Sequence, residues 1–178
     1  VRLIRGDMRD GVAGPYELMT CPFRGFQHLV NLDDQRRALR GVRRALSAGG
    51  TFLFDLFYPS LELLRAPPRR VESVAHRDPQ SGELAARFDS LAIDRRRQLL
   101  RVEMRWERQR SGLPAERLSQ VSVSLRWFEL PELELLLDDC DLRIVDVYGD
   151  FDGAPFDADS SELIVRCAPV ARRPEREP

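Results

Sequence analysis

The segment Leu46–Phe57, with the sequence LSAGGTFLFDLF, decides the interpretation of the fold. Its adjacent glycines, Gly49 and Gly50, favour a helix stop, because a residue without Cβ readily adopts the left-handed conformation that closes a helix. The run 51–57 is apolar except at Asp55. A short apolar run rich in aromatics directly after such a stop indicates a strand covered on both faces. The segment therefore predicts an α/β protein, in which ligands bind beyond the carboxyl ends of the strands.

The composition is that of a globular domain with balanced charge. The chain has 178 residues, of which 43% are hydrophobic and 32% charged, and its net charge is −1. This balance argues against a bulk field that would attract nucleic acid or an anionic membrane. The three cysteines, Cys21, Cys140 and Cys167, are odd in number and widely separated, which suits a reducing compartment and indicates no metal site. We expect a cytoplasmic protein with no signal peptide and no membrane span.

Strand and helix signals alternate along the first third of the chain. Residues 1–5 alternate apolar and basic side chains, as a half-buried strand does, and residues 16–21 are a second strand candidate. Asn31 is a candidate N-cap, and apolar residues follow it at helical spacing as far as Leu46. The predicted order is strand, turn, strand, helix, glycine stop and strand.

The pattern changes in the middle of the chain, where a proline-punctuated connection leads into alternating segments. Three segments alternate apolar and polar residues, and they are 87–93, 100–107 and 121–127. Such alternation is typical of strands with one buried face. We therefore expect residues 60–127 to form an antiparallel β insertion that packs as a lid over the carboxyl edge of the main sheet. Trp106 and Trp127 fall on the predicted buried face, which favours core packing for both.

The last part returns to mixed helix and strand. Pro131 fits the first position of a helix. Strands are expected at 142–148 and 161–168, and the short connection between them predicts an antiparallel pair. The domain boundaries that follow are 1–168 for a single domain, 1–59 and 128–168 for its core, 60–127 for the insertion and 169–178 for a disordered tail.

Five motifs carry a resemblance to a known family. They are GDMRD at 6–10, CPFRGFQHL at 21–29, LSAGG at 46–50, LPEL at 130–133 followed by CDL at 140–142, and YGDFDG at 148–153. Together they resemble the later part of a class I S-adenosylmethionine-dependent methyltransferase of the bacterial type that acts on small molecules. The family orders its strands 3-2-1-4-5-7-6. The resemblance thus implies an α/β, incomplete Rossmann-like sheet with the later strands, the final antiparallel hairpin and the lid insertion.

The chain also departs from the family's pattern. The family's glycine-rich loop and its ribose-binding acidic residue have no counterpart among the 178 residues. This implies an amino-terminally truncated methyltransferase, or one half of a split one. We expect residues 1–178 alone to be inactive. The strand at Leu18 would have an open apolar edge, which favours self-association, pairing with a missing segment or pairing with residues 1–5.

The resemblance assigns roles by position in its motifs. Asp7 would accept a hydrogen bond from the adenine amino group, and the Met8 N–H would meet a ring nitrogen. The cofactor-binding residues so implied are Asp7, Met8, Cys21 and Phe23. The acceptor-binding residues are Arg24, Phe26, Tyr58 and Arg126. The aromatic side chains would favour the sulfonium by cation–π contact, and His28 is the candidate general base.

Each of these residues also has a structural interpretation. Asp7 suits an ordinary turn, the aromatics suit a core, His28 suits a hydrogen-bonded structural role, and the two arginines suit the surface. Two functions therefore stay open. One is methyl transfer from S-adenosylmethionine to a small-molecule acceptor, and the other is a non-catalytic remnant or split half that pairs with another chain. Nucleic-acid binding is disfavoured by the charge balance, and the insertion carries no motif that names the acceptor.

Overall fold

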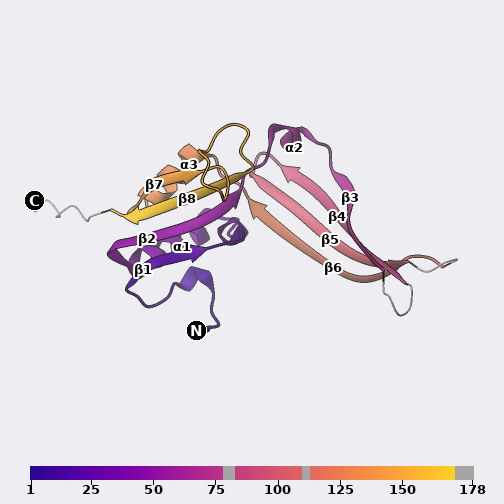
Figure 1. Ribbon diagram of the computed structural model, residues 1–178, viewed down its shortest axis with the longest axis horizontal. Helices are drawn as coiled ribbons and strands as arrows, with labels where there is room; N and C mark the ends of the chain where they lie inside the picture. Colours follow the sequence, from indigo (N-terminus) through magenta and orange to yellow (C-terminus); the bar gives the residue numbers. More distant parts are fainter. Residues whose placement is uncertain (78–82, 110–112, 171–178) are drawn as a thin grey trace, which may run out of the picture. The chain divides into compact units, whose positions relative to one another are not determined.

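The computed structural model describes residues 1–77, 83–109 and 113–170 (Figure 1). The chain divides into two compact units. The first combines Val1–Ser60 with Trp127–Pro178, and the second is Leu61–Arg126. The tail was predicted at 169–178. The last strand ends at Pro169, and residues 171–178 lie outside the described residues. None of the described helices is both long enough and apolar enough to cross a membrane.

The first unit is built on a mixed four-stranded sheet in the order β1-β2-β8-β7. The strands are β1 (Tyr16–Cys21), β2 (Leu46–Phe57), β7 (Leu142–Tyr148) and β8 (Glu162–Pro169). β1 and β2 are parallel, whereas β8 runs antiparallel to both β2 and β7. The resemblance implied this order for the family's strands four to seven. The α/β class and the final antiparallel hairpin are therefore confirmed.

Helices connect and cover these strands (Figure 1). They are α1 (Leu32–Ala45), α3 (Leu130–Asp138) and the short 3-10 helices η1 (Met8–Asp10) and η2 (Gly25–His28). Parallel strands need a crossover, and α1 supplies it between β1 and β2. The predicted N-cap is confirmed, because the Asn31 side chain accepts a hydrogen bond of 2.9 Å from the Asp34 N–H. Proline stands in the first turn of α3 as expected.

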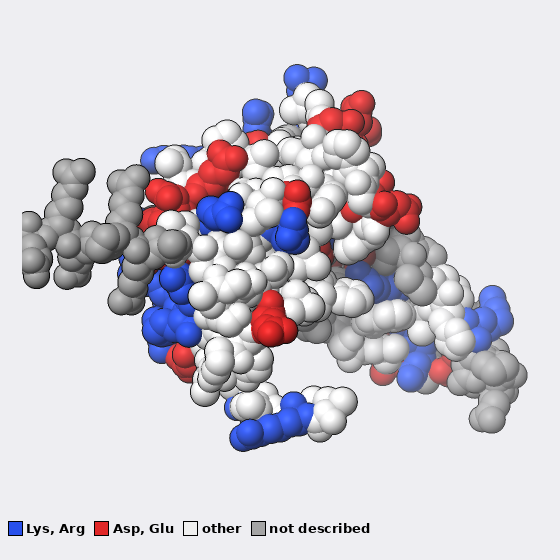
Figure 2. Space-filling model, turned by 60° about the vertical axis from the view of Figure 1, so that its left-hand side comes forward, with Lys and Arg blue, Asp and Glu red and all other residues white. Residues whose placement is uncertain are grey.

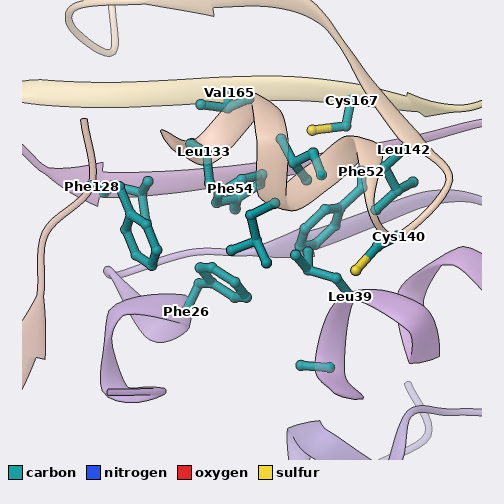
Figure 3. Packing of buried hydrophobic residues seen from close by; sticks show 14 of the residues in the cluster. Phe26, Leu39, Phe52, Phe54, Phe128, Leu133, Cys140, Leu142, Val165 and Cys167 are labelled. Atoms are coloured by element: carbon teal, nitrogen blue, oxygen red, sulfur yellow. The ribbon is translucent and has the colours of Figure 1, made fainter. Parts of the chain in front are cut away.

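The core of the first unit lies between the sheet and its helices (Figure 3). Phe26 from η2 packs against Phe54 of β2 and Phe128, with ring centroids 5.5 and 5.6 Å apart. Leu39 of α1 and Leu133 of α3 are fully buried in the same cluster. Burial of each such side chain stabilises the fold by about 1.5–3 kcal/mol. The aromatic loop after β1 is thus fixed to the sheet by one of its own rings.

The predicted glycine stop is wrong. Helix α1 ends at Ala45, and β2 begins at the next residue, so both glycines lie inside the strand. Neither of them has a positive φ. A Cβ on Gly50 would lie 2.7 Å from the Tyr16 carbonyl oxygen of β1. The glycine is therefore needed for close approach of two strands, at the point where their register shifts between Tyr16 and Leu18.

The predicted strand at residues 1–5 is also wrong. This segment has no strand conformation, and its apolar side chains, including Leu3 at 91% exposure, face solvent. A strand needs a neighbour to pair its backbone groups, and within the described residues β1 pairs only with β2. Leu18 of β1 is 59% exposed. The edge of β1 therefore stays open, as expected, and residues 1–5 do not move over to close it.

The second unit is a separate antiparallel sheet in the order β3-β4-β5-β6. It comprises α2 (Leu61–Arg65), β3 (Arg69–Arg77), β4 (Leu84–Asp94), β5 (Leu99–Gln109) and β6 (Glu116–Arg126). The three predicted strands are confirmed as β4, β5 and β6. The expectation of a bare connection before them is wrong, because α2 and β3 occupy it. An irregular register between Glu72 and Val74 breaks the period of two in β3.

The predicted buried face of this sheet is only partly buried. Val121 is 53% exposed and Trp106 is half-buried. Trp127 is 4% exposed, but it follows the end of β6 and belongs to the first unit. Core packing is therefore confirmed for Trp127 alone. The lid role of the insertion stays a prediction.

Candidate functional site

Four of the predicted site residues line one cavity of the first unit. This Met8 cavity measures about 350 Å³ and is bounded by the segment around η1, by β1, by α1 and by β2. The predicted residues in its lining are Asp7, Met8, Cys21 and Phe26. The remaining lining is mainly aliphatic, with a second methionine, Met19. The cavity can therefore take a flat apolar group whose polar edge meets Asp7.

The Asp7 carboxylate is held at the rim by Arg9. Its Oδ1 accepts hydrogen bonds of 2.9 and 3.0 Å from the Arg9 backbone N–H and Nε, and its Oδ2 accepts one of 2.7 Å from Nη2. Arg9 also donates to both oxygens of Asp34 at 3.2 Å. The Arg9 side chain, and after it the Arg9 backbone N–H, hold the pKa of Asp7 well below its usual range. A carboxylate has about four lone-pair positions, so Oδ2 has room for one further donor.

The loop after β1 adopts an unusual backbone. Phe23 and Arg24 both have left-handed φ values, of 58° and 59°. Such values are uncommon for residues other than glycine and concentrate at functional sites. The loop is held by a 3.0 Å hydrogen bond from the Arg24 N–H to Asp55 Oδ2, in β2. As a consequence the Phe23 side chain is 94% exposed.

A buried amide fixes the other end of this loop. The Gln27 side chain is fully buried, donates to the Phe57 carbonyl at 3.0 Å and accepts from the Phe57 N–H at 2.8 Å. Gln27 therefore pairs with the backbone of β2 as a neighbouring strand would. Phe57 stands at the carboxyl end of β2, so this contact fixes η2 at the edge of the sheet where ligands of α/β proteins bind.

A second cavity is also lined by residues of this loop. This Asp55 cavity measures about 540 Å³ and is lined by Pro22, Phe23, Arg24, Asp55, Phe151 and Glu162. Arg24 Nη2 contacts Glu162 Oε1 at 2.6 Å, and its guanidinium lies 4.9 Å from the centre of the Phe57 ring. Two of the predicted residues, Phe23 and Arg24, are therefore together here and not in the Met8 cavity.

The thiol at the end of β1 is unsuited to nucleophilic chemistry. Burial, and after it the charge of Asp55, raises the pKa of Cys21, so the thiol form is favoured at neutral pH. A Cβ on Gly25 would lie 2.9 Å from the Cys21 sulfur, which explains the glycine at the start of η2. Cys21 thus serves as a small apolar wall of the Met8 cavity.

The three other predicted residues are not in the lining of the two cavities. His28 is exposed in η2 and is absent from the lining of both. Tyr58 donates a 2.8 Å hydrogen bond to Glu129 Oε2, and burial together with Glu129 raises its pKa to about 12. Arg126 ends β6 in the second unit and donates to Gln98 Oε1 at 3.3 Å. The site roles of these three residues therefore stay predictions.

Some residues of the site were missed from the sequence. Asp55 was visible as the one charged residue in an apolar strand, but it received no site role. Glu162 meets Arg24 across 138 positions of sequence, and no local pattern predicts that pairing. Arg9 lies two residues from Asp7 inside the turn motif, so its role could have been inferred from the spacing.

Comparisons with known proteins give a structural likeness and no sequence match. No protein-family model and no curated protein matches the chain. A S-adenosylmethionine-dependent methyltransferase from Clostridium acetobutylicum matches 96% of this chain and 65% of its own, with 15% identity and a TM-score of 0.74. The CcbJ methyltransferase from Streptomyces caelestis matches 93% and 62%, with 20% identity and a TM-score of 0.75.

A third structure is CalS10 with bound S-adenosylmethionine, an amino pentose methyltransferase from Micromonospora echinaspora. It matches 93% of this chain and 63% of its own, with 17% identity and a TM-score of 0.65. The chain therefore spans less than two thirds of the length of each of these three proteins. Over the part that it spans, the chain has the fold of the class I S-adenosylmethionine-dependent methyltransferases.

Proposed function

We propose that this protein transfers a methyl group from S-adenosylmethionine to a small-molecule acceptor. The observation that carries the proposal is the sheet order β1-β2-β8-β7, in which β1 and β2 are parallel and β8 is antiparallel to both of its neighbours. The S-adenosylmethionine-dependent methyltransferase from Clostridium acetobutylicum matches 96% of the chain at a TM-score of 0.74. Similar structures include a sugar N-methyltransferase and a glycopeptide N-methyltransferase bound to S-adenosylmethionine. These relatives support both a small acceptor and this cofactor.

The Met8 cavity fits the adenine end of the cofactor. Its lining is mainly apolar, and its one carboxylate, Asp7, has an acceptor position left on Oδ2. Asp7 would accept from the exocyclic amino group, the Met8 backbone would meet the ring, and Cys21 and Phe26 would pack on the ring faces. The bound cofactor would supply an electrophilic methyl group on a sulfonium. Arg9 would keep Asp7 ionised and correctly turned.

The acceptor would approach from the side of the Asp55 cavity. Phe23 is exposed and lines the Asp55 cavity, and it would cover the reacting methyl group. Arg24, Tyr58 and Arg126 are the residues proposed to bind the acceptor. His28 is the proposed general base for an acceptor that arrives protonated. The insertion would exclude water as a lid.

A second candidate function rests on the edge of β1. Leu18 is exposed, and within the part of the chain that the structure describes β1 pairs on one side only, which favours pairing with a further strand, from the same polypeptide or from another chain. In the family order that neighbour would be strand one, so pairing and catalysis are compatible. A non-catalytic pairing module would keep the edge and bind no S-adenosylmethionine. Nucleic acid is not favoured as a partner, because Figure 2 shows acidic and basic side chains intermixed on the visible face.

Calorimetry with S-adenosylmethionine tests the proposed function. The protein would be expressed from the complete coding region that contains residues 1–178. We expect saturable binding, weakened by about 1–2 kcal/mol, or about five- to thirtyfold, by Asp7→Ala, which is the scale of a lost hydrogen bond to a charged group. Asp33→Ala removes an exposed carboxylate of α1 and is the matched control. Absence of binding would favour the pairing module, and equal affinity of both variants would remove Asp7 from the site.

A further inference from the structure

The Asp55 cavity contains acceptors that the fold itself does not satisfy. Asp55 is only 7% exposed, and within the described residues its carboxylate accepts one hydrogen bond, from the Arg24 N–H to Oδ2. Glu162 Oε2 is buried and has no hydrogen-bond partner. A buried acceptor without a donor costs free energy. Both residues line the same cavity, so a donor group placed there would offset that cost.

The charge of the cavity favours a cation. Its lining holds two carboxylates, on Asp55 and Glu162, and one guanidinium, on Arg24. The guanidinium pairs with Glu162 Oε1 and lies over the Phe57 ring, so it is already engaged by protein groups. This leaves a net excess of negative charge in a recess. An anionic ligand would meet both carboxylates at close range.

Two exposed aromatic rings flank these carboxylates. Phe23 is 94% exposed and Phe151 is 74% exposed, and both line the cavity. Phe151 stands on an ordered turn, because Asp150 Oδ1 accepts hydrogen bonds of 2.9 Å from the N–H groups of Asp152 and Ala154. Exposed aromatics on a fixed backbone beside a cavity are typical of ligand sites. Their faces also attract a cation.

We propose that the Asp55 cavity binds an organic amine in its protonated form. The ammonium group donates hydrogen bonds to the carboxylates of Asp55 and Glu162, and the apolar body of the ligand packs between Phe23 and Phe151. A metal ion suits the cavity less, since no group of three or more candidate ligands occurs among the residues described. The further statement that this amine is the methyl acceptor rests on the proposed function. In that case the ammonium group would first give a proton to the Asp55 or Glu162 carboxylate, and its nitrogen lone pair would then take the methyl group as S-adenosylhomocysteine leaves.

The first test uses the unaltered protein and three probes of one shape. These are 2-phenylethylamine, 2-phenylethanol and 3-phenylpropanoate, which carry a positive, a neutral and a negative end. Calorimetry at neutral pH should give the amine a millimolar Kd, the alcohol at least tenfold weaker binding, and the carboxylate none. Equal binding of amine and alcohol would overturn the proposal, because the carboxylates would then contribute nothing. Preference for the carboxylate would assign the cavity to Arg24.

The second test places the amine in this cavity. Glu162→Gln keeps the shape and removes one charge, and we expect about tenfold weaker amine binding. Phe23→Ala alters a side chain that is almost entirely exposed, so folding is unaffected, and we expect a loss of about three- to tenfold. Glu134→Gln, on the exposed face of α3, is the matched charge control and should change nothing. Full amine affinity in both test variants would exclude the site.

Failure of this inference is separate from failure of the proposed function. Amine binding is measured without S-adenosylmethionine, and cofactor binding without amine. A protein that binds the cofactor but shows no preference for the amine keeps the proposed function and loses the amine site. One that binds the amine and no cofactor keeps the site and loses methyl transfer.

Discussion

Replacement of Gln27 tests how the loop after β1 is fixed to the sheet. Gln27→Met keeps the side-chain volume but leaves the N–H and the C=O of Phe57 without this partner. Each buried backbone group left unpaired costs about 1–3 kcal/mol. We therefore expect the free energy of unfolding of the first unit to fall by about 3 kcal/mol.

Gln35 offers a matched comparison. It is also a fully buried glutamine, but its amide makes one contact, a 2.6 Å hydrogen bond from Nε2 to the Leu29 carbonyl, and its Oε1 has no partner. Gln35→Met should therefore lower the free energy of unfolding by only about 1 kcal/mol. The substitution leaves the Leu29 carbonyl without its donor, but it also removes the unpaired Oε1.

The assay is urea unfolding followed by the fluorescence of Trp127. Trp127 is buried in the first unit, and a Trp106→Phe background removes the second of the two tryptophans. With an m-value of about 1–3 kcal/mol/M, Gln27→Met should lower the midpoint by about 1–3 M. A shift no larger than that of Gln35→Met would refute the reasoning, since the Phe57 backbone would then need no partner from η2.

Three further predictions concern glycine, tyrosine and cysteine. Gly50→Ala should lower the free energy of unfolding by about 1–3 kcal/mol through its clash with β1, whereas Gly49→Ala, which has open space, should change it by less than about 0.5 kcal/mol; equal urea midpoints would contradict this. The folded-state pKa of Tyr58 is raised, so the folded protein holds this proton more tightly. Its contribution to stability should be complete below about pH 10 and lost as the pH rises to about 12, and Tyr58→Phe should flatten that part of a stability profile. At pH 8 Cys21, which is only partly buried, should react slowly with a disulfide reagent, whereas Cys140 and Cys167 are 2% and 0% exposed and should react only in urea; rapid reaction of three thiols in the folded protein would contradict the buried core.

The sequence predicts most elements where local pattern and packing agree. Strand β2, the N-cap at Asn31 and the strands β4 to β6 follow from periodicity and capping chemistry. The glycine stop was wrong because two glycines admit both a left-handed turn and a close strand approach, and only the position of β1 decides between them. Residues 1–5 have the alternation of a strand, but a strand also needs a neighbour, which periodicity does not contain.

The site was predicted unevenly for the same reason. Asp7, Met8, Cys21 and Phe26 belong to short motifs, and the structure brings them together in one cavity. The Asp55 cavity depends on Glu162 of β8, which reaches the loop only through the sheet order. A contact that joins the two ends of the chain leaves no local trace in the sequence. The role of Arg126 stays a prediction, since the insertion is a unit of its own.

The most direct test of the account is a nuclear magnetic resonance experiment on Met8, Met19 and Met104 in the protein expressed from the complete coding region. Met8 and Met19 line the Met8 cavity, whereas Met104 belongs to β5 in the second unit. With ¹³C-labelled methionine methyl groups, assigned by Met→Leu variants, addition of S-adenosylhomocysteine should shift the signals of Met8 and Met19 and leave that of Met104 in place. Saturable shifts confined to the first two would place the adenosyl group in the Met8 cavity. Three unmoved signals, or a shift of Met104 alone, would contradict the proposed cofactor site.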